Sequence, residues 1–215
     1  MFSITRITKD PQVRQNELMD TALELFLAAG YQNTTVQDIV KSIQVAQGTF
    51  YYYFPSKEAI VEAILSRHVQ RMIAEVQAFT SNNLLEKLQL FINLFYKLSY
   101  FGEPGLICKI LYKEDQGLLI NKLWRQTIVI TNPLLSQLLE ECNQAGLTKV
   151  IHMEETLAFF GGIMAALLEA SSPTEFGHEA NPQVMKNKLS IAEKMIESLF
   201  GTASGSIHLE SPQPK

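Results

Sequence analysis

Apolar residues recur along most of the chain at spacings of three and four, which is the period of an amphipathic helix. The face expected over residues 10–30 consists of Leu18, Ala22, Leu25, Phe26 and Ala29. A longer stripe follows Pro55 and consists of Ile60, Val61, Ile64, Leu65, Val69, Met72, Ile73 and Val76. Because the spacing is helical rather than alternating, the pattern predicts an all-α chain and disfavours a many-stranded β protein.

The early helices are bounded by start and stop signals. Gly30 ends the first, because glycine freely takes the positive φ of a helix C-terminus. Thr34 and Gln37 read as a capping box that opens a second helix, which runs to about Ser42. A break at residues 43–45 follows.

A third short helix is predicted over about residues 46–53, and Pro55 ends it. Ser56 then caps a long fourth helix. Two short helices joined by a tight three-residue break, with a helix before them, form a helix-turn-helix.

The rest of the chain is also predicted to be helical, over about residues 82–98, 106–112, 115–145, 154–170 and 184–199. Residues 102–105 are expected to form a turn, and Asn132-Pro133 to kink or break its helix. From Gly201 the tail is rich in Gly, Ser and Pro, which predicts disorder. The expected organisation is a helix-turn-helix domain over 1–55, an all-helical domain over 56–201 and a disordered tail over 202–215.

Composition supports a globular chain. With 215 residues and 47% hydrophobic residues, the chain can bury one or two cores. Its two cysteines exclude a dense disulfide framework. The longest apolar run, residues 157–168, is too short to span a membrane, and MFSITRITKD lacks the apolar core of a secretory signal. A soluble cytoplasmic protein is therefore expected.

Charge does not by itself indicate a nucleic-acid partner. The net charge is −4, and residues 1–71 balance seven Lys and Arg against seven Asp and Glu. The acidic excess therefore lies in the later part of the chain. A nucleic-acid partner must be argued from local geometry.

The third helix carries residues suited to a DNA groove. The second helix of a helix-turn-helix enters the major groove, and small or hydrogen-bonding residues at its start let the backbone approach the bases. Gln47 can pair with adenine, Gly48 keeps the surface flat, and the methyl group of Thr49 can touch a thymine methyl.

Three tyrosines follow these residues. The hydroxyls of Tyr51, Tyr52 and Tyr53 can reach phosphate oxygens without adding charge. Phe50 and Phe54 are expected to be core residues. The alternative is that the whole run is an aromatic core cluster, but three consecutive tyrosines cannot all face one core on a helix.

Lys57 lies in the first turn of the fourth helix. A lysine ammonium at this position, together with the free N–H groups of a helix start, can hold a phosphate.

The segment TTVQDIVKSIQVAQGTFYYYFPSKEAIVEAIL resembles the DNA-binding domain of the TetR (tetracycline repressor) family of bacterial transcription regulators. The resemblance covers about residues 12–65. The matching positions are Phe26, Gly30-Tyr31, Thr34-Thr35, Ile39, Gly48-Thr49, Tyr51-Tyr52, Phe54 and Ser56-Lys57-Glu58.

The resemblance implies roles for particular residues. Thr35, Tyr51 and Lys57 would contact phosphates, whereas Thr34 would mainly cap the second helix. Base edges would be faced by Gln47, Gly48 and Thr49. Tyr53 occupies a position that is often histidine and lies at the DNA.

The sequence departs from the family pattern at four positions. Gln44 stands where a turn glycine is common, and Ala46 replaces a frequent serine cap, which costs about 1 kcal/mol of helix stability. Gln47 replaces a frequent lysine, and Val36 stands where a polar residue sometimes reads a base. The basic residues that could compensate for the lost charge are Arg6, Lys9 and Arg14.

In the TetR family the larger part of the chain dimerises and binds a small molecule. The last two long helices are the candidates for the dimer face. Its candidate residues, with ordinary core packing as the alternative, are Phe159, Gly162, Ala166, Met195, Ile196 and Leu199. A two-fold dimer would hold two recognition helices about 34–36 Å apart, one turn of DNA.

An effector pocket is expected to be mostly apolar with a few polar groups. Its candidate residues are Phe95, Tyr96, Cys108, Tyr112, Trp124, Thr127, Phe160 and Met164. For each of them, plain core packing is the alternative.

No catalytic residues are predicted. The sequence holds no P-loop, dinucleotide fingerprint, nucleophile elbow or zinc-protease motif. His152 and Glu155 lack a third metal ligand, so neither a metal nor a cofactor is expected. A redox switch between Cys108 and Cys142 is disfavoured against two small buried side chains.

The sequence thus predicts a homodimeric repressor that binds operator DNA, has no membrane partner, and is released by a small-molecule effector. The alternatives are an enzyme or ligand carrier on a helical fold, and a helix-turn-helix protein that acts through protein partners without an effector.

Overall fold

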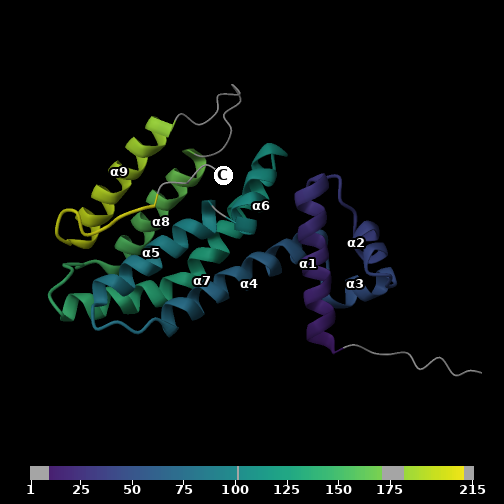
Figure 1. The fold of residues 1–215 in the computed structure, drawn as a ribbon, viewed down its shortest axis with the longest axis horizontal. Helices are drawn as coiled ribbons and strands as arrows, with labels where there is room; N and C mark the ends of the chain where they lie inside the picture. Colours follow the sequence, from purple (N-terminus) through teal and green to yellow (C-terminus); the bar gives the residue numbers. More distant parts are fainter. Residues whose placement is uncertain (1–9, 101, 171–181, 211–215) are drawn as a thin grey trace, which may run out of the picture. The chain divides into compact units, whose positions relative to one another are not determined.

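The computed structural model describes residues 10–100, 102–170 and 182–210. These residues form helices and connecting segments with no β-strand, which confirms the all-α prediction. None of the described helices is long and apolar enough to cross a membrane. The helices are α1 (Pro11–Ala29), α2 (Val36–Ser42), α3 (Gln47–Tyr53), α4 (Lys57–Ala78), α5 (Leu84–Tyr100), α6 (Gly102–Lys113), α7 (Gly117–Gln144), α8 (Met153–Ala170) and α9 (Pro182–Phe200) (Figure 1).

The chain divides into two compact units, residues 1–65 and residues 66–215. The boundary falls inside α4, ten residues after the position expected from the sequence. Apolar residues of α4 are buried on both sides of the boundary, such as Ile60 and Ile64 before it and Met72 after it.

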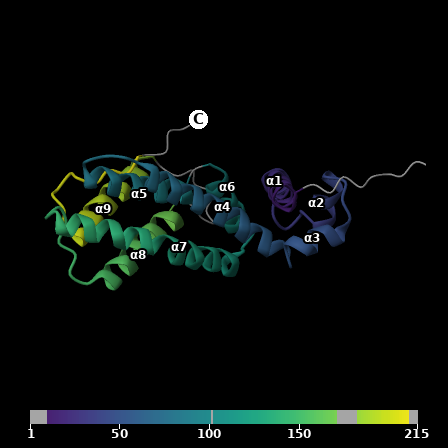
Figure 2. The same cartoon turned by 90° about the horizontal axis from the view of Figure 1, so that it is seen from below.

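In the first unit, α1 packs on α2, and α2 packs on α3 (Figure 2). Asp10 caps α1 by accepting hydrogen bonds from the backbone N–H groups of Gln12 and Val13, at 2.8 and 3.3 Å. Gly30 ends α1 with a φ of 91°, as predicted. The buried residues of the three helices are Leu18, Met19, Ala22, Leu23 and Phe26 of α1, Ile39 and Val40 of α2, and Phe50 of α3.

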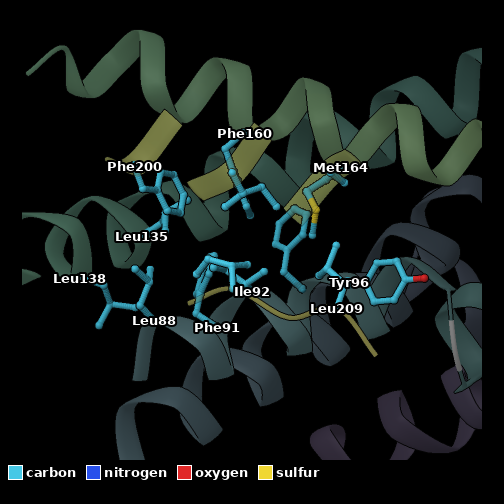
Figure 3. Close-up of a cluster of buried hydrophobic side chains, with 14 of the residues drawn as sticks. Leu88, Phe91, Ile92, Tyr96, Leu135, Leu138, Phe160, Met164, Phe200 and Leu209 are labelled. Carbon is cyan, nitrogen blue, oxygen red and sulfur yellow. The ribbon is translucent and has the colours of Figure 1, made fainter. Parts of the chain in front are cut away.

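The core of the second unit lies among α5, α7, α8 and α9 and is rich in aromatic rings (Figure 3). The ring of Phe160 lies 6.4 Å from that of Phe91, 5.6 Å from that of Phe95 and 5.6 Å from that of Phe200. Because Phe160 contacts rings from both α5 and the end of α9, it joins the two sides of this core.

Two sequence-based boundaries in this unit were wrong. α6 begins at Gly102, so residues 102–105 form the first turn of a helix rather than a loop. A helix tolerates Pro104 there because first-turn N–H groups have no intrahelical partner. α7 is one helix from residue 117 to 144 with Pro133 in its interior, so the break expected there was wrong, whereas the kink stays a prediction.

The predicted disorder of the tail was also wrong for residues 202–210. Ile207 and Leu209 are buried in the core of the second unit, at 1% and 6% exposure. Two buried apolar side chains offset the entropy of ordering this short segment. Residues 1–9, 171–181 and 211–215, expected as an arm, a polar loop and the end of the tail, lie outside the described residues.

Gly201 lets the chain turn from α9 into this segment. Its φ is 64°, and a Cβ placed there would lie 2.8 Å from Cβ and 3.2 Å from the backbone nitrogen of Lys149. The approach is close because the Lys149 N–H donates a 2.8 Å hydrogen bond to the Phe200 carbonyl.

Substituting Gly201 tests whether this turn holds the end of the chain. Gly201→Ala adds both a left-handed backbone penalty and a clash, so we expect it to lower the free energy of unfolding by about 2–3 kcal/mol. Gly205→Ala is the matched control, because Gly205 also has a positive φ (77°) but has open space around its Cβ position. We expect the control to cost about 1 kcal/mol. Urea denaturation measures both, and equal losses would contradict the steric role of Gly201.

Candidate nucleic-acid interface

The first helix of the helix-turn-helix, α2, is capped by Thr35, one residue later than predicted. The Thr35 hydroxyl accepts from the Asp38 N–H at 3.2 Å, and Asp38 Oδ2 accepts from the Thr35 N–H at 2.9 Å. The Thr35 hydroxyl also donates to Asp38 Oδ2 at 2.6 Å. The hydrogen bonds from the Thr35 hydroxyl and N–H lower the pKa of Asp38, because they favour its charged form. The prediction of Thr34 and Gln37 as the box was therefore wrong.

Thr34 has a different role. Its side chain is 2% exposed, and its hydroxyl donates to the carbonyl oxygen of Gly30 at 2.7 Å and lies 3.3 Å from that of Leu25. Gly30 directly follows α1 and Leu25 lies near its end, so the Thr34 hydroxyl binds the C-terminal end of that helix. Thr34 thus closes α1, and Thr35 opens α2.

The turn between α2 and α3 contains two of the four residues that depart from the family pattern. Gln44 takes a φ of 55°, a left-handed conformation that glycine adopts more easily. The chain tightens there through the Val45 N–H, which donates to the Val40 carbonyl at 3.0 Å. Ala46 stands at the N-cap of α3 and supplies no side-chain hydrogen bond, as predicted.

The outward face of α3 is polar and aromatic. Gln47 and Gly48 are exposed, and Thr49 and Tyr53 are half-buried. Tyr51 and Tyr52 are 51% and 78% exposed, which is high for large aromatic side chains.

The inward face of α3 is the predicted pair of phenylalanines. Phe50 is fully buried and Phe54 is 3% exposed, with ring centroids 5.8 Å apart. The alternative of a single aromatic core cluster was therefore wrong, because the same helix separates buried phenylalanines from exposed tyrosines.

Gly48 has no structural reason to be glycine. Nothing lies within 4 Å of the position that its Cβ would occupy, and its φ is not in the left-handed region. A glycine within a helix costs about 1 kcal/mol relative to alanine. The first unit therefore carries a destabilising residue at the exposed start of α3 with no neighbour that requires it.

Lys57 points at the protein rather than into solvent. Its ammonium donates to the carbonyl oxygens of Tyr31 at 2.6 Å and Thr34 at 2.9 Å, with that of Gln32 at 3.5 Å. It also lies 4.2 Å from the centre of the Tyr31 ring, a cation–π contact. In this structure Lys57 fastens the turn between α1 and α2, a role that the sequence did not indicate.

Of the basic residues that could compensate for the missing lysine at position 47, the one in the described part of the chain is paired with a carboxylate. Arg14 forms a 2.7 Å ion pair with Glu17, three residues later on α1. Arg6 and Lys9 lie outside the described residues.

Comparison with known proteins identifies this arrangement. A sequence model of the "Bacterial regulatory proteins, tetR family" matches residues 18–64, which span the helix-turn-helix and the start of α4. Residues 18–64 therefore form a DNA-binding domain of the TetR family.

Curated relatives are transcriptional regulators, not enzymes. The chain is 36% identical over 63 residues to the HTH-type transcriptional regulator YuxN of Bacillus subtilis, covering 29% of this chain and 22% of that protein. It is 35% identical over 80 residues to the HTH-type transcriptional repressor KstR2 of Mycolicibacterium smegmatis, covering 36% and 39%. The matches therefore span well under two thirds of these relatives.

Solved structures share the fold over most of the chain. A TetR-family transcriptional regulator from Syntrophomonas wolfei superposes with a TM-score of 0.66 at 19% identity, covering 87% of this chain and 96% of that one. GusR of Salmonella enterica gives a TM-score of 0.63 at 17% identity, covering 92% and 100%.

In the second unit, most of the candidate effector residues are core residues. Phe95, Tyr96, Phe160 and Met164 are at most 2% exposed. Trp124 is half-buried and packs edge-on against Phe95, with ring centroids 5.7 Å apart.

The polar candidates differ in what they offer. The Thr127 hydroxyl donates to the Leu123 carbonyl of its own helix at 3.0 Å. Burial raises the pKa of the Tyr96 hydroxyl. Cys108 and Tyr112 are half-buried on α6, and burial raises the pKa of the Cys108 thiol to about 11.

The two cysteines are both free thiols. Burial, with the nearby Glu141 carboxylate, also raises the pKa of Cys142. Thiols with raised pKa values are protonated and unreactive at neutral pH, which agrees with the prediction of small buried side chains.

The candidate dimer residues divide into two groups. Phe159 and Met195 are 66% and 50% exposed, and Gly162 and Ala166 are exposed as well. Ile196 is fully buried in the core, so its assignment to an outer face was wrong.

A groove with a volume of about 460 Å³ is lined by residues of α8 and α9. Its lining residues are Phe159, Ile163, Ile191, Lys194, Met195, Ser198 and Leu199. Ile191, which is 59% exposed, was not among the residues predicted from the sequence. Its position four residues before Met195, on the same side of α9, was the available signal.

Replacing Lys57 tests its role in the turn. Lys57→Met removes charged hydrogen bonds to carbonyl oxygens, so we expect the free energy of unfolding to fall by about 1.5–3 kcal/mol. Lys41→Met is the matched control, because Lys41 is an exposed lysine of the same unit. We expect the control to change stability by less than about 0.5 kcal/mol. Urea denaturation followed by circular dichroism gives both values, and similar losses would show that the carbonyl contacts contribute nothing.

Proposed function

We propose that this chain is a sequence-specific, DNA-binding transcriptional repressor that acts as a homodimer and leaves its operator when a small molecule binds the second unit. The observation that carries the proposal is the bare backbone at Gly48, exposed at the start of α3 and flanked by Gln47 and Thr49. Because the fold does not need glycine there, its cost of about 1 kcal/mol is best explained by a surface that must come close to the α3 backbone.

The neighbours of Gly48 supply the chemistry that base edges require. Gln47 offers an amide that can pair with adenine at N6 and N7. The methyl group of Thr49 suits the methyl group of thymine. These contacts carry sequence information, whereas contacts to phosphates fix position.

The exposed tyrosines supply the phosphate contacts. Tyr51 and Tyr52 present hydroxyls on the same exposed helix and add no charge. Thr35 and Tyr53 are kept as further contacts at the DNA. Lys57 contacts phosphate only if its ammonium leaves the carbonyls of Tyr31 and Thr34, so we assign it to the turn.

A second copy of this chain is the proposed partner on the α8–α9 groove. Phe159, Ile191 and Met195 expose apolar surface together on two adjacent helices. A two-fold axis through this face brings the same two helices of a second copy against it, which covers both faces at once. The dimer then presents two recognition helices to a symmetric site.

The proposed effector is held largely by apolar contact. The buried candidates in the second unit are rings and a thioether, and the Thr127 hydroxyl is already donated within its helix. Binding shifts the population toward a conformer whose recognition helices no longer match the spacing of the operator.

Selection of DNA sites from a random pool tests the proposal directly. The full-length protein should enrich a two-fold symmetric motif whose half-sites are about 10 base pairs apart. An asymmetric half-site would contradict the dimer, and no enriched motif from folded, ligand-free protein would contradict sequence reading. Denaturing a portion of the sample and analysing the released small molecules by mass spectrometry shows whether the protein is ligand-free.

Gly48→Ala should separate stability from binding. A methyl group fits the open space, so we expect the free energy of unfolding to rise by about 0.5–1 kcal/mol. The same methyl group should weaken binding to the selected site at least tenfold, because it occupies the space where α3 meets the bases. Gly117→Ala, at the start of α7 and also with open space, is the control that should leave DNA binding unchanged. If Gly48→Ala protein binds the selected site as tightly as wild type, the proposal that Gly48 lets the α3 backbone approach the bases is contradicted.

A further inference from the structure

Residues 202–210 follow α9 and bring an extended segment into the second unit. Along this segment Ile207 and Leu209 are buried, whereas His208 and Glu210 are exposed. This alternation is that of an extended chain with one face on a core. Leu209 lies near Ile92 and Tyr96 of α5 in the core (Figure 3).

The backbone on one edge of the segment is bonded to α9. The Ile207 N–H donates to Glu197 Oε1 at 3.1 Å, and the Leu209 N–H donates to Glu193 Oε1 at 2.7 Å. The two carboxylates are four residues apart on α9 and therefore on the same side of that helix. Glu197 is 7% exposed, and this hydrogen bond gives its buried charge a partner.

The opposite edge is bonded to α5. Gln89 donates from Nε2 to the His208 carbonyl at 2.6 Å and accepts from the His208 N–H at 2.9 Å. Lys97, on the same side of α5 two turns later, forms a 2.7 Å ion pair with Glu210. Successive peptide groups of the segment thus point alternately to α9 and to α5.

This geometry gives α9 a second packing partner besides α8. The main helix packing of α9 is against α8, and the segment fills the place between α9 and α5 with two apolar side chains and the hydrogen bonds above. The outer face of the same helix carries Ile191 and Met195 of the α8–α9 groove. Any shift of α9 away from α5 would therefore change the shape of that groove.

We propose that residues 202–210 are a latch that positions α9 and thereby sets the dimer face. This inference rests on the dimer in the proposed function. It assigns a role in assembly to a segment that touches the core and not the groove itself.

Four full-length variants test the latch. Leu209→Ser removes the inner anchor, and His208→Ser, one residue earlier and exposed, is the matched control. Glu193→Ala removes an acceptor for the segment, and Glu193→Gln keeps an oxygen that accepts the same N–H. We expect Leu209→Ser and Glu193→Ala to raise the dimer dissociation constant at least tenfold in sedimentation equilibrium. His208→Ser and Glu193→Gln should stay within about threefold of wild type.

A variant that is destabilised as much as Leu209→Ser, but at another place in the second unit, separates a specific effect of the latch from a general loss of stability. Leu111→Ala removes a fully buried side chain on α6, which packs on α5 and α7. If it lowers the melting temperature as much as Leu209→Ser yet leaves the dimer intact, the effect of Leu209 is specific. Equal weakening by both variants overturns the latch. If the wild-type protein is a dimer and both Leu209→Ser and Glu193→Ala dimerise as tightly as it does, the latch is overturned but the dimer stands. Wild-type protein that is monomeric throughout overturns the dimer and the latch together.

Discussion

The first unit depends on side chains that satisfy the backbone where the chain changes direction. Between α1 and α2 the chain passes through six residues, and the carbonyls there accept from the Thr34 hydroxyl and the Lys57 ammonium. Unsatisfied carbonyls in a partly buried turn would cost about 1–3 kcal/mol each. Because Lys57 is the first residue of α4, the same contacts join the start of α4 to the turn that sets α2.

α3 shows the opposite behaviour, since its local sequence works against its own stability. Its N-cap Ala46 makes no side-chain hydrogen bond, Gln44 before it takes a left-handed φ, and Gly48 lies in open space. α2, in the same unit, has a complete capping box. Such a conflict between local sequence and fold is expected at functional surfaces, where selection favours binding to a partner over stability of the fold. The low intrinsic stability of α3, like its exposed polar face, therefore supports the proposal that this helix is a binding surface.

Sequence patterns predicted the helices, the helix-turn-helix and the division of α3 into buried Phe50 and exposed tyrosines. They could not place the capping residue, because Thr34 and Thr35 each precede a polar side chain by three residues. Only the packing of Thr34 against the end of α1 decides between them. The role of Lys57 was hidden for a similar reason, since its carbonyl partners lie 23–26 residues away.

The second unit shows what periodicity leaves undecided on a helix that is apolar on most sides. Phe159 and Phe160 are neighbours in the sequence, but one is 66% exposed and the other 1%. Met195 and Ile196 divide in the same way on α9. The pattern identified both pairs as apolar, but the direction of each side chain depends on how α8, α9 and residues 202–210 pack together. A tail whose composition indicates disorder therefore contributes to deciding which apolar residues of α8 and α9 stay exposed.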